Sequence, residues 1–236
     1  MRNINMSYPD LNDDDRNIVQ AVLQTPNLSM GKYIQQFERS FCDLMNCHHA
    51  IGVSSGTAGL HLCLRALGIE AGDLVLTTPF SFVASTNVML FEKALPVYVD
   101  VDPVTGNIDP QQLEQAAQDL VEGGSKAQKW LPKQIPAKGW QAGGELKALL
   151  PVDVFGQPAD YDLINPLARR YNLRVIEDSC EALGAEYKGR NAGMLADCGV
   201  FAFYPNKQIT TAEGGMIVTN DAKAAMLMNA MRNQGR

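Results

Sequence analysis

The sequence predicts a three-layer α/β fold in which a mostly parallel sheet lies between two layers of helices. Short apolar runs of strand length alternate along the chain with longer segments in which apolar residues recur at helical spacing. This alternation favours parallel strands that are joined by right-handed helical crossovers. With 236 residues, of which 46% are hydrophobic and 19% are charged, the chain is long enough to bury a full core.

Each element is predicted from its local pattern. The first helix can be capped by Asn12 or Asp13 and carries one apolar stripe. We expect a helical segment over residues 1–47 and an α/β core over residues 48–236. The predicted helices are residues 13–23, 33–45, 59–67, 83–90, 109–120, 160–171 and 221–233. The predicted strands are residues 49–53, 73–77, 95–99, 146–154, 173–178 and 199–204.

Residues 121–145 interrupt the alternation. This segment is rich in glycine and lysine, contains both tryptophans, Trp130 and Trp140, and has no clear period. It is predicted to be a surface insertion. A mobile loop over the functional site and a contact between two copies of the chain are both compatible with its composition.

Composition excludes several classes of protein. A net charge of -6 argues against binding to nucleic acid or to an anionic membrane surface. No apolar run approaches the length of a membrane span, and the N-terminus lacks the core of a signal peptide, so we expect a cytoplasmic protein. The five cysteines are scattered and odd in number, which argues against a disulfide framework. Cys42, Cys47, His48 and His49 lie close in sequence, but no second ligand pair follows at a zinc-like spacing, so no metal site is expected.

One carboxylate and one lysine stand at predicted strand ends. Asp178 closes an apolar run, and Lys207 follows a second run and precedes a Gly-rich turn. Because open α/β sheets bind ligands at the C-terminal ends of their strands, the two side chains are expected at one site. A solvated loop lysine is the simpler interpretation of Lys207 taken alone. Together, however, these parts suit pyridoxal phosphate, with the lysine as its Schiff-base partner and the aspartate on the pyridine nitrogen.

A phosphate cradle is predicted where the strand at residues 49–53 turns into a helix. The turn holds Ser55, Gly56, Thr57 and Ala58, whose small side chains let an anion approach free N–H groups at a helix N-terminus. An ordinary capped turn would have the same composition. The chain has no full nucleotide-binding fingerprint, so the turn suits a single phosphate. Phe82, after another predicted strand, could stack on a flat ring or could be part of the core.

Six motifs make the chain resemble the DegT/DnrJ/StrS family of sugar-nucleotide aminotransferases. They occur in order, and the match runs from about Pro9 to Arg236. The motifs are residues 31–38 (GKYIQQFE), 54–60 (SSGTAGL), 77–84 (TTPFSFVA), 156–160 (GQPAD), 177–184 (EDSCEALG) and 201–215 (FAFYPNKQITTAEGG).

The resemblance implies an aspartate-aminotransferase-like fold, that of the large domain of fold type I enzymes. It implies Lys207 as the Schiff-base lysine, Asp178 at the pyridine nitrogen, Phe82 on the ring, and Thr57 with Ala58 at the phosphate. It also implies transfer of an amino group, usually from glutamate, to a nucleotide-linked keto-sugar, as in the biosynthesis of cell-surface polysaccharides, and a homodimer. By position alone, Gly31 and Tyr33 are candidates for the sugar site.

The chain departs from the family pattern at three positions. Glu181 stands where many members have glutamine or histidine near the cofactor hydroxyl, and Ala202 replaces a serine that often contacts the phosphate. Asp153 replaces a more usual histidine. Similar proteins also continue into a smaller C-terminal domain, so residues 1–236 are expected to be the large domain alone.

Three functions remain open from the sequence. The first is the sugar aminotransferase or its cofactor-binding half. The second is a dehydratase of the same family, a branch that replaces the lysine with histidine, so Lys207 counts against it. The third is a non-catalytic remnant that binds pyridoxal phosphate or a sugar nucleotide, or only dimerises.

Overall fold

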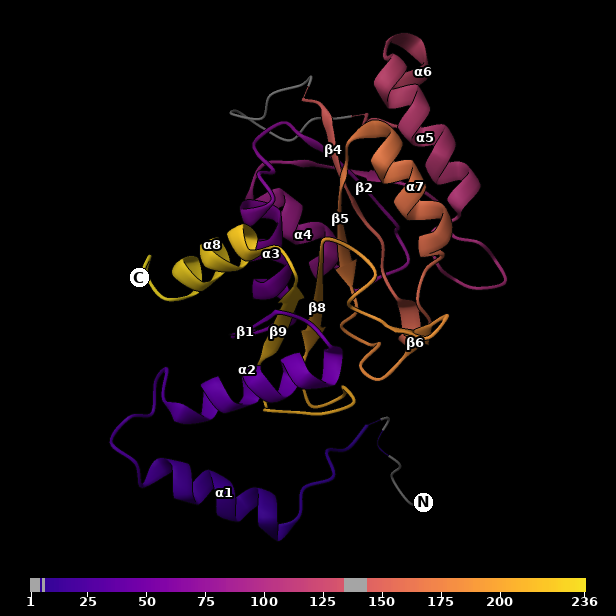
Figure 1. Ribbon diagram of the computed structural model, residues 1–236. Coiled ribbons are helices and arrows are strands. Elements are labelled where there is room, and N and C mark those ends of the chain that lie inside the picture. The colour runs from indigo at the N-terminus through magenta and orange to yellow at the C-terminus, as the bar shows by residue number, and fades with distance from the viewer. Residues whose placement is uncertain (1–4, 6, 134–143) are drawn as a thin grey trace.

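The predicted three-layer α/β fold is confirmed by a computed structural model, which describes residues 5, 7–133 and 144–236 (Figure 1). Its central sheet has seven strands in the order β1-β9-β8-β5-β4-β2-β3. The strands are β1 His49–Val53, β2 Leu74–Thr77, β3 Leu95–Tyr98, β4 Leu146–Leu150, β5 Arg174–Asp178, β8 Cys198–Ala202 and β9 Gly215–Thr219. A separate small hairpin joins β6 Glu186–Tyr187 to β7 Arg190–Asn191.

The sheet is parallel from β8 to β3, whereas β9 pairs antiparallel with both β8 and β1. The sequence analysis missed β9 entirely. Because β9 reverses direction between them, β1 and β8 run the same way. The C-terminal ends of β1, β8 and β5 therefore meet at one edge of the sheet, where a ligand is expected.

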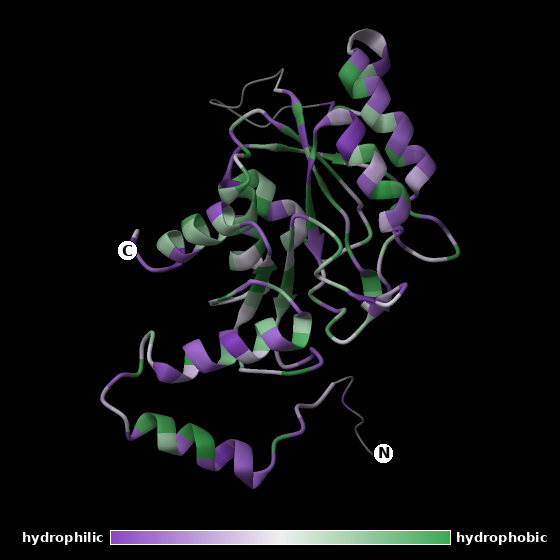
Figure 2. Cartoon of the chain, in the orientation of Figure 1, coloured by the Kyte–Doolittle hydropathy of each residue, from purple (hydrophilic) through white to green (hydrophobic). Residues whose placement is uncertain are grey.

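Helices cover both faces of the sheet (Figure 1). On one face, α3 Gly56–Ala66, α4 Ala84–Phe91 and α8 Ala222–Arg232 pack on the largest core cluster, which includes Leu64, Val88 and Met228. On the other face, α5 Pro110–Glu122 and α7 Tyr161–Tyr171 cover β2 to β5, and α2 Lys32–Met45 covers β1, β9 and β8. Figure 2 shows the hydrophobic residues concentrated on the strands and on the sides of the helices that face them.

The first helix, α1 Asp13–Leu23, does not join this core. Its N-terminus is capped as predicted, because Asn12 accepts hydrogen bonds from two backbone N–H groups of the first turn. Its apolar stripe is nevertheless exposed, with Val19 57% and Leu23 65% accessible to solvent. In Figure 1 α1 lies on the far side of α2 from the sheet. No helix in the described part of the chain is long and apolar enough to cross a membrane.

The described parts of the predicted insertion lie away from the C-terminal strand ends. The short helix α6 Gly124–Gln128 follows α5, and Trp130 donates a hydrogen bond of 2.8 Å to Asp119 of α5. Glu145 accepts a hydrogen bond from the N–H of Leu74, the first residue of β2. This end of the segment is therefore at the N-terminal edge of the sheet. Trp140 is outside the described residues.

Some predicted boundaries were wrong near the strand ends. The strand expected over residues 146–154 stops at Leu150 and is followed by a 3-10 turn, η1 Val154–Gly156. The strand expected over 199–204 spans Cys198–Ala202. The helix expected from residue 59 begins at Gly56, so the predicted phosphate cradle forms the first helical turn itself.

Candidate active site

Asp178 is fixed at the C-terminal end of β5. The residue is 5% exposed. Its Oδ2 atom accepts a hydrogen bond of 2.6 Å from the hydroxyl of Ser85, in the first turn of α4, and its Oδ1 accepts one of 3.3 Å from the N–H of Cys180. Hydrogen bonds to a carboxylate hold its orientation. Asp178 is therefore an oriented acid next to a cavity.

Lys207 lies in the loop between β8 and β9. A turn sets its backbone, because the Lys207 N–H donates to the carbonyl of Tyr204 at 2.9 Å. Its Nζ donates to Oε1 of Glu181 at 2.9 Å, and its side chain is 15% exposed. The other oxygen of Glu181 accepts a hydrogen bond of 3.1 Å from the N–H of Phe155. Glu181 thus links the lysine to the η1 turn.

The structure brings these predicted residues to one cavity. Lys207, Asp178, Glu181 and Phe82 all line a cavity of about 310 Å³, although they come from three different segments. The Phe82 side chain is far from the core, since the residue is 78% exposed. The remaining lining residues are Phe80, Ser81, Val152, Asp153, Val154, Phe155 and Cys180.

The predicted phosphate cradle, residues 55–58, is the N-terminus of α3. Ser55 caps the helix, and its hydroxyl accepts a hydrogen bond of 3.1 Å from the N–H of Ala58. Within the described residues, no hydrogen bond occupies the N–H groups of Gly56 and Thr57. The first N–H groups of a helix have no partner inside it and can bind an anion. The free donors are thus those of Gly56 and Thr57 rather than that of Ala58.

Close packing places this turn beside the cavity. A Cβ atom added to Gly56 would stand 2.7 Å from the sulfur of Cys180, which lines the cavity, and 2.9 Å from the Cβ of Ala202. Burial, aided by the Asp178 carboxylate, raises the pKa of the Cys180 thiol well above its ordinary value, so the thiol is uncharged. Only a residue without a side chain fits at position 56.

Two buried carboxyl groups lie next to the cavity. Asp153 and Glu177 are each 0% exposed. Burial, with the nearby Asp153 charge, raises the pKa of Glu177 well above its ordinary value, and burial also raises the pKa of Asp153. Asp153 accepts hydrogen bonds from Ala159 N–H at 3.0 Å, Tyr161 Oη at 3.1 Å and Ser179 Oγ at 2.7 Å. The two carboxyl groups therefore hold a proton to higher pH than exposed acids do.

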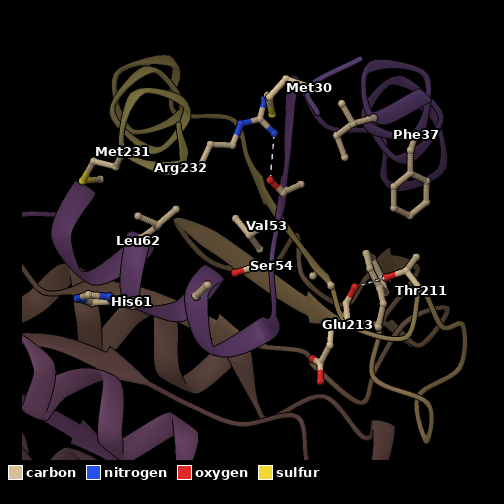
Figure 3. A pocket seen from close by; sticks show the side chains of 16 residues that line it. Met30, Phe37, Val53, Ser54, His61, Leu62, Thr211, Glu213, Met231 and Arg232 are labelled. Carbon is tan, nitrogen blue, oxygen red and sulfur yellow. Dashed lines mark hydrogen bonds between the residues drawn. The ribbon is translucent and has the colours of Figure 1, made fainter. Parts of the chain in front are cut away.

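Gly31 and Tyr33 are not brought to the Lys207 cavity. Gly31 is the N-cap of α2, and its neighbours Met30 and Ile34 line a different and larger cavity of about 550 Å³ (Figure 3). Ala58 and Ser54 line that cavity too, and Arg232 and Glu213 lie on opposite sides of it in the figure. It adjoins the α3 turn but lacks Lys207 and Asp178.

Sequence reasoning missed Ser85 as the partner of Asp178. The two residues are 93 positions apart, and a serine in a helical first turn gives no local signal of such a contact. Among the described residues, no three histidine, cysteine or acidic side chains gather as a metal site would require.

Comparison with known proteins places the chain in a family. The sequence profile of the DegT/DnrJ/EryC1/StrS aminotransferase family matches residues 9–236. The chain belongs to this family. It is 40% identical over 233 residues to a GDP-perosamine synthase of Caulobacter vibrioides, covering 98% of this chain and 56% of that protein. It is 34% identical over 236 residues to EpsN of Bacillus subtilis, a putative pyridoxal phosphate-dependent aminotransferase, covering 100% of this chain and 56% of EpsN.

A solved structure confirms the fold of this family member. PseC of Helicobacter pylori, an aminotransferase of pseudaminic acid biosynthesis, superimposes with a TM-score of 0.84 at 30% identity, covering 99% of this chain and 57% of PseC. The chain thus spans little more than half the length of the relatives it matches.

Proposed function

We propose that this family member is the cofactor-binding part of a pyridoxal 5'-phosphate-dependent aminotransferase that acts on a nucleotide-linked keto-sugar. One observation carries the proposal: the amine of Lys207 and the carboxylate of Asp178 line the same cavity of about 310 Å³. The N-terminal turn of α3, with the N–H groups of Gly56 and Thr57, adjoins it. An amine, a carboxylate and an anion site around one cavity of this size suit a small phosphorylated heterocycle.

Each residue has a role that fits its surroundings. The N–H groups of Gly56 and Thr57, in the turn capped by Ser55, would hold the phosphate. Asp178, held by Ser85, would face the pyridine nitrogen as its counter-charge. The exposed ring of Phe82 would cover one face of the cofactor.

The chemistry divides between the cofactor and the chain. Pyridoxal phosphate supplies a carbonyl that takes up an amine and a ring that stores the electrons released at the substrate carbon. Lys207 would supply the amine that attaches the cofactor, and its Nζ would take and return the proton at the reacting carbon. Glu181 holds the Lys207 amine at the cavity by a hydrogen bond of 2.9 Å and must release it when the lysine acts.

The names of the relatives support the choice of substrate. A GDP-perosamine synthase and a transaminase that forms a UDP-linked amino sugar are both similar to this chain. We propose a nucleotide-linked keto-sugar as the acceptor and glutamate as the amino donor. We also propose that the protein is a cytoplasmic homodimer that contributes to polysaccharide biosynthesis. The dehydratase branch of the family replaces this lysine with histidine, so the presence of Lys207 counts against that alternative.

The first half-reaction, amino transfer from glutamate to the cofactor, distinguishes an aminotransferase from a remnant that only binds the cofactor. The protein is loaded with pyridoxal phosphate and mixed with L-glutamate, and the 2-oxoglutarate released is measured against enzyme concentration. We expect one equivalent per loaded site from the wild type and none from Lys207→Ala. Cofactor attachment at Lys207 without any 2-oxoglutarate, with each of several amino acids as donor, would favour the remnant.

A further inference from the structure

Cys42 and Cys47 form a pair of thiols where α2 ends. The backbone reverses there through Asn46, which has φ 52° and ψ 50°, in the left-handed region that asparagine tolerates. The N–H of Cys47 donates a hydrogen bond of 3.1 Å to the carbonyl of Cys42. In a helix end of this type, the side chains of the two hydrogen-bonded residues come together on one side of the chain. One thiol therefore lies against the other.

The two thiols differ in their access to solvent. Cys42 is half-buried, whereas Cys47 is only 8% exposed. The sulfur of Cys47 donates a hydrogen bond of 3.4 Å to the carbonyl of His49, the first residue of β1. Burial, aided by the neighbouring Cys42 thiol, raises the pKa of Cys47 to about 12. A reagent in solution therefore meets Cys42 first, while Cys47 stays protonated behind it.

A second pair of thiols lies in the core and lacks this access. Cys63 of α3 and Cys198 of β8 are 0% and 1% exposed. A hydrogen bond with Cys63, together with burial, raises the pKa of the Cys198 thiol well above its ordinary value. Buried thiols that no reagent can reach are inert. Of the two pairs, the one at the end of α2 combines contact between thiols with a route to solvent.

The geometry of the first pair is compatible with a disulfide. A disulfide needs Cα atoms roughly 4.4–6.8 Å apart, a range that a direct backbone hydrogen bond between two residues permits. Cys42 and Cys47 belong to the same helix end, so no other element has to move for the bond to form. In compartments that keep thiols reduced, disulfides are mostly transient and catalytic or redox-sensing. A pair that is reduced at rest and closes on oxidation fits this pattern.

We propose that Cys42 and Cys47 are a redox-sensitive modification site, which small disulfides such as oxidised glutathione convert to an intrachain disulfide. The Cys42 thiolate attacks one sulfur of the small disulfide, forms a mixed disulfide and releases one thiol. Cys47 then gives its proton to solvent, and its sulfur attacks the Cys42 sulfur and displaces the second thiol. Two electrons thus pass from the cysteine pair to the small disulfide, which leaves as two thiols. The new bond fixes the end of α2 at the start of β1.

Reaction of the whole chain with oxidised glutathione tests this proposal. The reduced protein is incubated with excess oxidised glutathione, quenched, unfolded and alkylated with N-ethylmaleimide. Mass spectrometry of the digested chain then gives the state of each cysteine. The variants are Cys42→Ala and Cys47→Ala. Cys180→Ala is the matched control, because Cys180 is a partly exposed cysteine outside the pair. Amide spectra of each variant check that it is folded.

We expect the wild type and Cys180→Ala to lose both alkylatable thiols of the pair and to retain no glutathione on Cys42 or Cys47. Cys47→Ala lacks the closing thiol and should retain one glutathione on Cys42, whereas Cys42→Ala should leave Cys47 free. Cys63 and Cys198 should stay alkylatable in every protein. Glutathione retained on Cys42 of the wild type, or a pair that remains free, would overturn the inference. The reaction involves no pyridoxal phosphate, so either result leaves the proposed function untouched.

Discussion

The hydroxyl of Ser85 donates a hydrogen bond of 2.6 Å to Asp178, and a second serine, Ser81, lies 2.7 Å from the Ser85 oxygen. Because the single hydroxyl proton of Ser85 is directed at Asp178, Ser85 can only accept in its hydrogen bond with Ser81. Ser81 directly precedes Phe82 in the chain. The loop that presents the Phe82 ring is thus connected to the carboxylate that would face the cofactor.

Ser85→Ala is expected to weaken pyridoxal phosphate binding by at least about tenfold, the lower end for a lost hydrogen bond to a charged group. Ser85 is 1% exposed, so water cannot easily replace the hydroxyl. A titration of the protein with pyridoxal phosphate, followed by absorbance, measures the change. Thr86→Ala, one position along the same helix, removes a hydroxyl that accepts a hydrogen bond from Tyr98 rather than contacting Asp178, and should bind like the wild type. Equal affinities for Ser85→Ala and the wild type would mean that Asp178 is positioned by other contacts.

Gly56→Ala is expected to displace the first turn of α3 and to destabilise the fold by about 1–3 kcal/mol, as for other overpacked sites. The new Cβ would meet the Cys180 sulfur at 2.7 Å and the Ala202 Cβ at 2.9 Å. Urea unfolding measures the loss. Adding Cys180→Ala to this variant removes the sulfur and should recover part of it; a double variant no more stable than the single one would argue against the predicted collision.

The raised pKa values of Asp153 and Glu177 predict that the free energy of unfolding falls as pH rises. Both pKa values are raised in the folded protein, mainly by burial, so the folded state keeps a proton that the unfolded chain releases above about pH 4.3. The stability from this pair is complete below that pH and is lost, at up to about 1.4 kcal/mol per pH unit, as pH rises through the raised folded pKa values.

Asp153→Asn removes one of the two acids and should flatten this dependence. The measurement is urea unfolding between pH 5 and 9. Asp43→Asn, which removes an exposed carboxylate of α2, is the control and should follow the wild type. If all three proteins lose stability in parallel, the pKa values of this pair are not raised in the folded protein.

Glu38, the last residue of the GKYIQQFE motif, joins three elements. Its carboxylate accepts hydrogen bonds from the Gly52 N–H of β1, at 2.9 Å, and from the guanidinium of Arg232 of α8. The Arg232 and Glu38 side chains are only 11% and 15% exposed. Glu38→Ala leaves a nearly buried charge unpaired and should cost about 3–5 kcal/mol.

Two comparisons test this assignment by urea unfolding. The double variant Glu38→Ala with Arg232→Met should be more stable than Glu38→Ala alone, because it removes the unpaired charge. Glu114→Ala breaks the ion pair of Glu114 with Arg170, in which both side chains are more than half exposed, and should cost less than about 1 kcal/mol. A Glu38→Ala variant as stable as Glu114→Ala would contradict the role given to Glu38.

The sequence predicted most helices and the parallel strands because these follow from local apolar periodicity. It did not reveal β9, although Gly215–Thr219 is buried at every residue. A five-residue apolar run after a glycine pair has no feature that fixes its direction, which is set by pairing with β1 and β8 far away in sequence. The apolar stripe of α1 was predicted correctly as a pattern, but in the described structure it covers no core.

The site could be predicted where a reactive side chain follows a predicted strand. Lys207 and Asp178 were expected together, and they line one cavity. Ser85 and the Phe155 turn could not be derived, because their importance comes from contacts with Asp178 and Glu181 across the fold. Gly31 and Tyr33 were chosen by position alone, and neither lines the cavity with Lys207.

The most direct test of the account is chemical fixation of pyridoxal phosphate on the chain. The protein is mixed with the cofactor, reduced with borohydride and digested, and the modified peptide is identified by mass spectrometry. We expect the phosphopyridoxyl group on Lys207 and nowhere else in significant yield, and no modification above background in Lys207→Ala. Modification spread over exposed lysines such as Lys32 and Lys223, with the same yield in Lys207→Ala, would contradict the assignment of this cavity as the cofactor site.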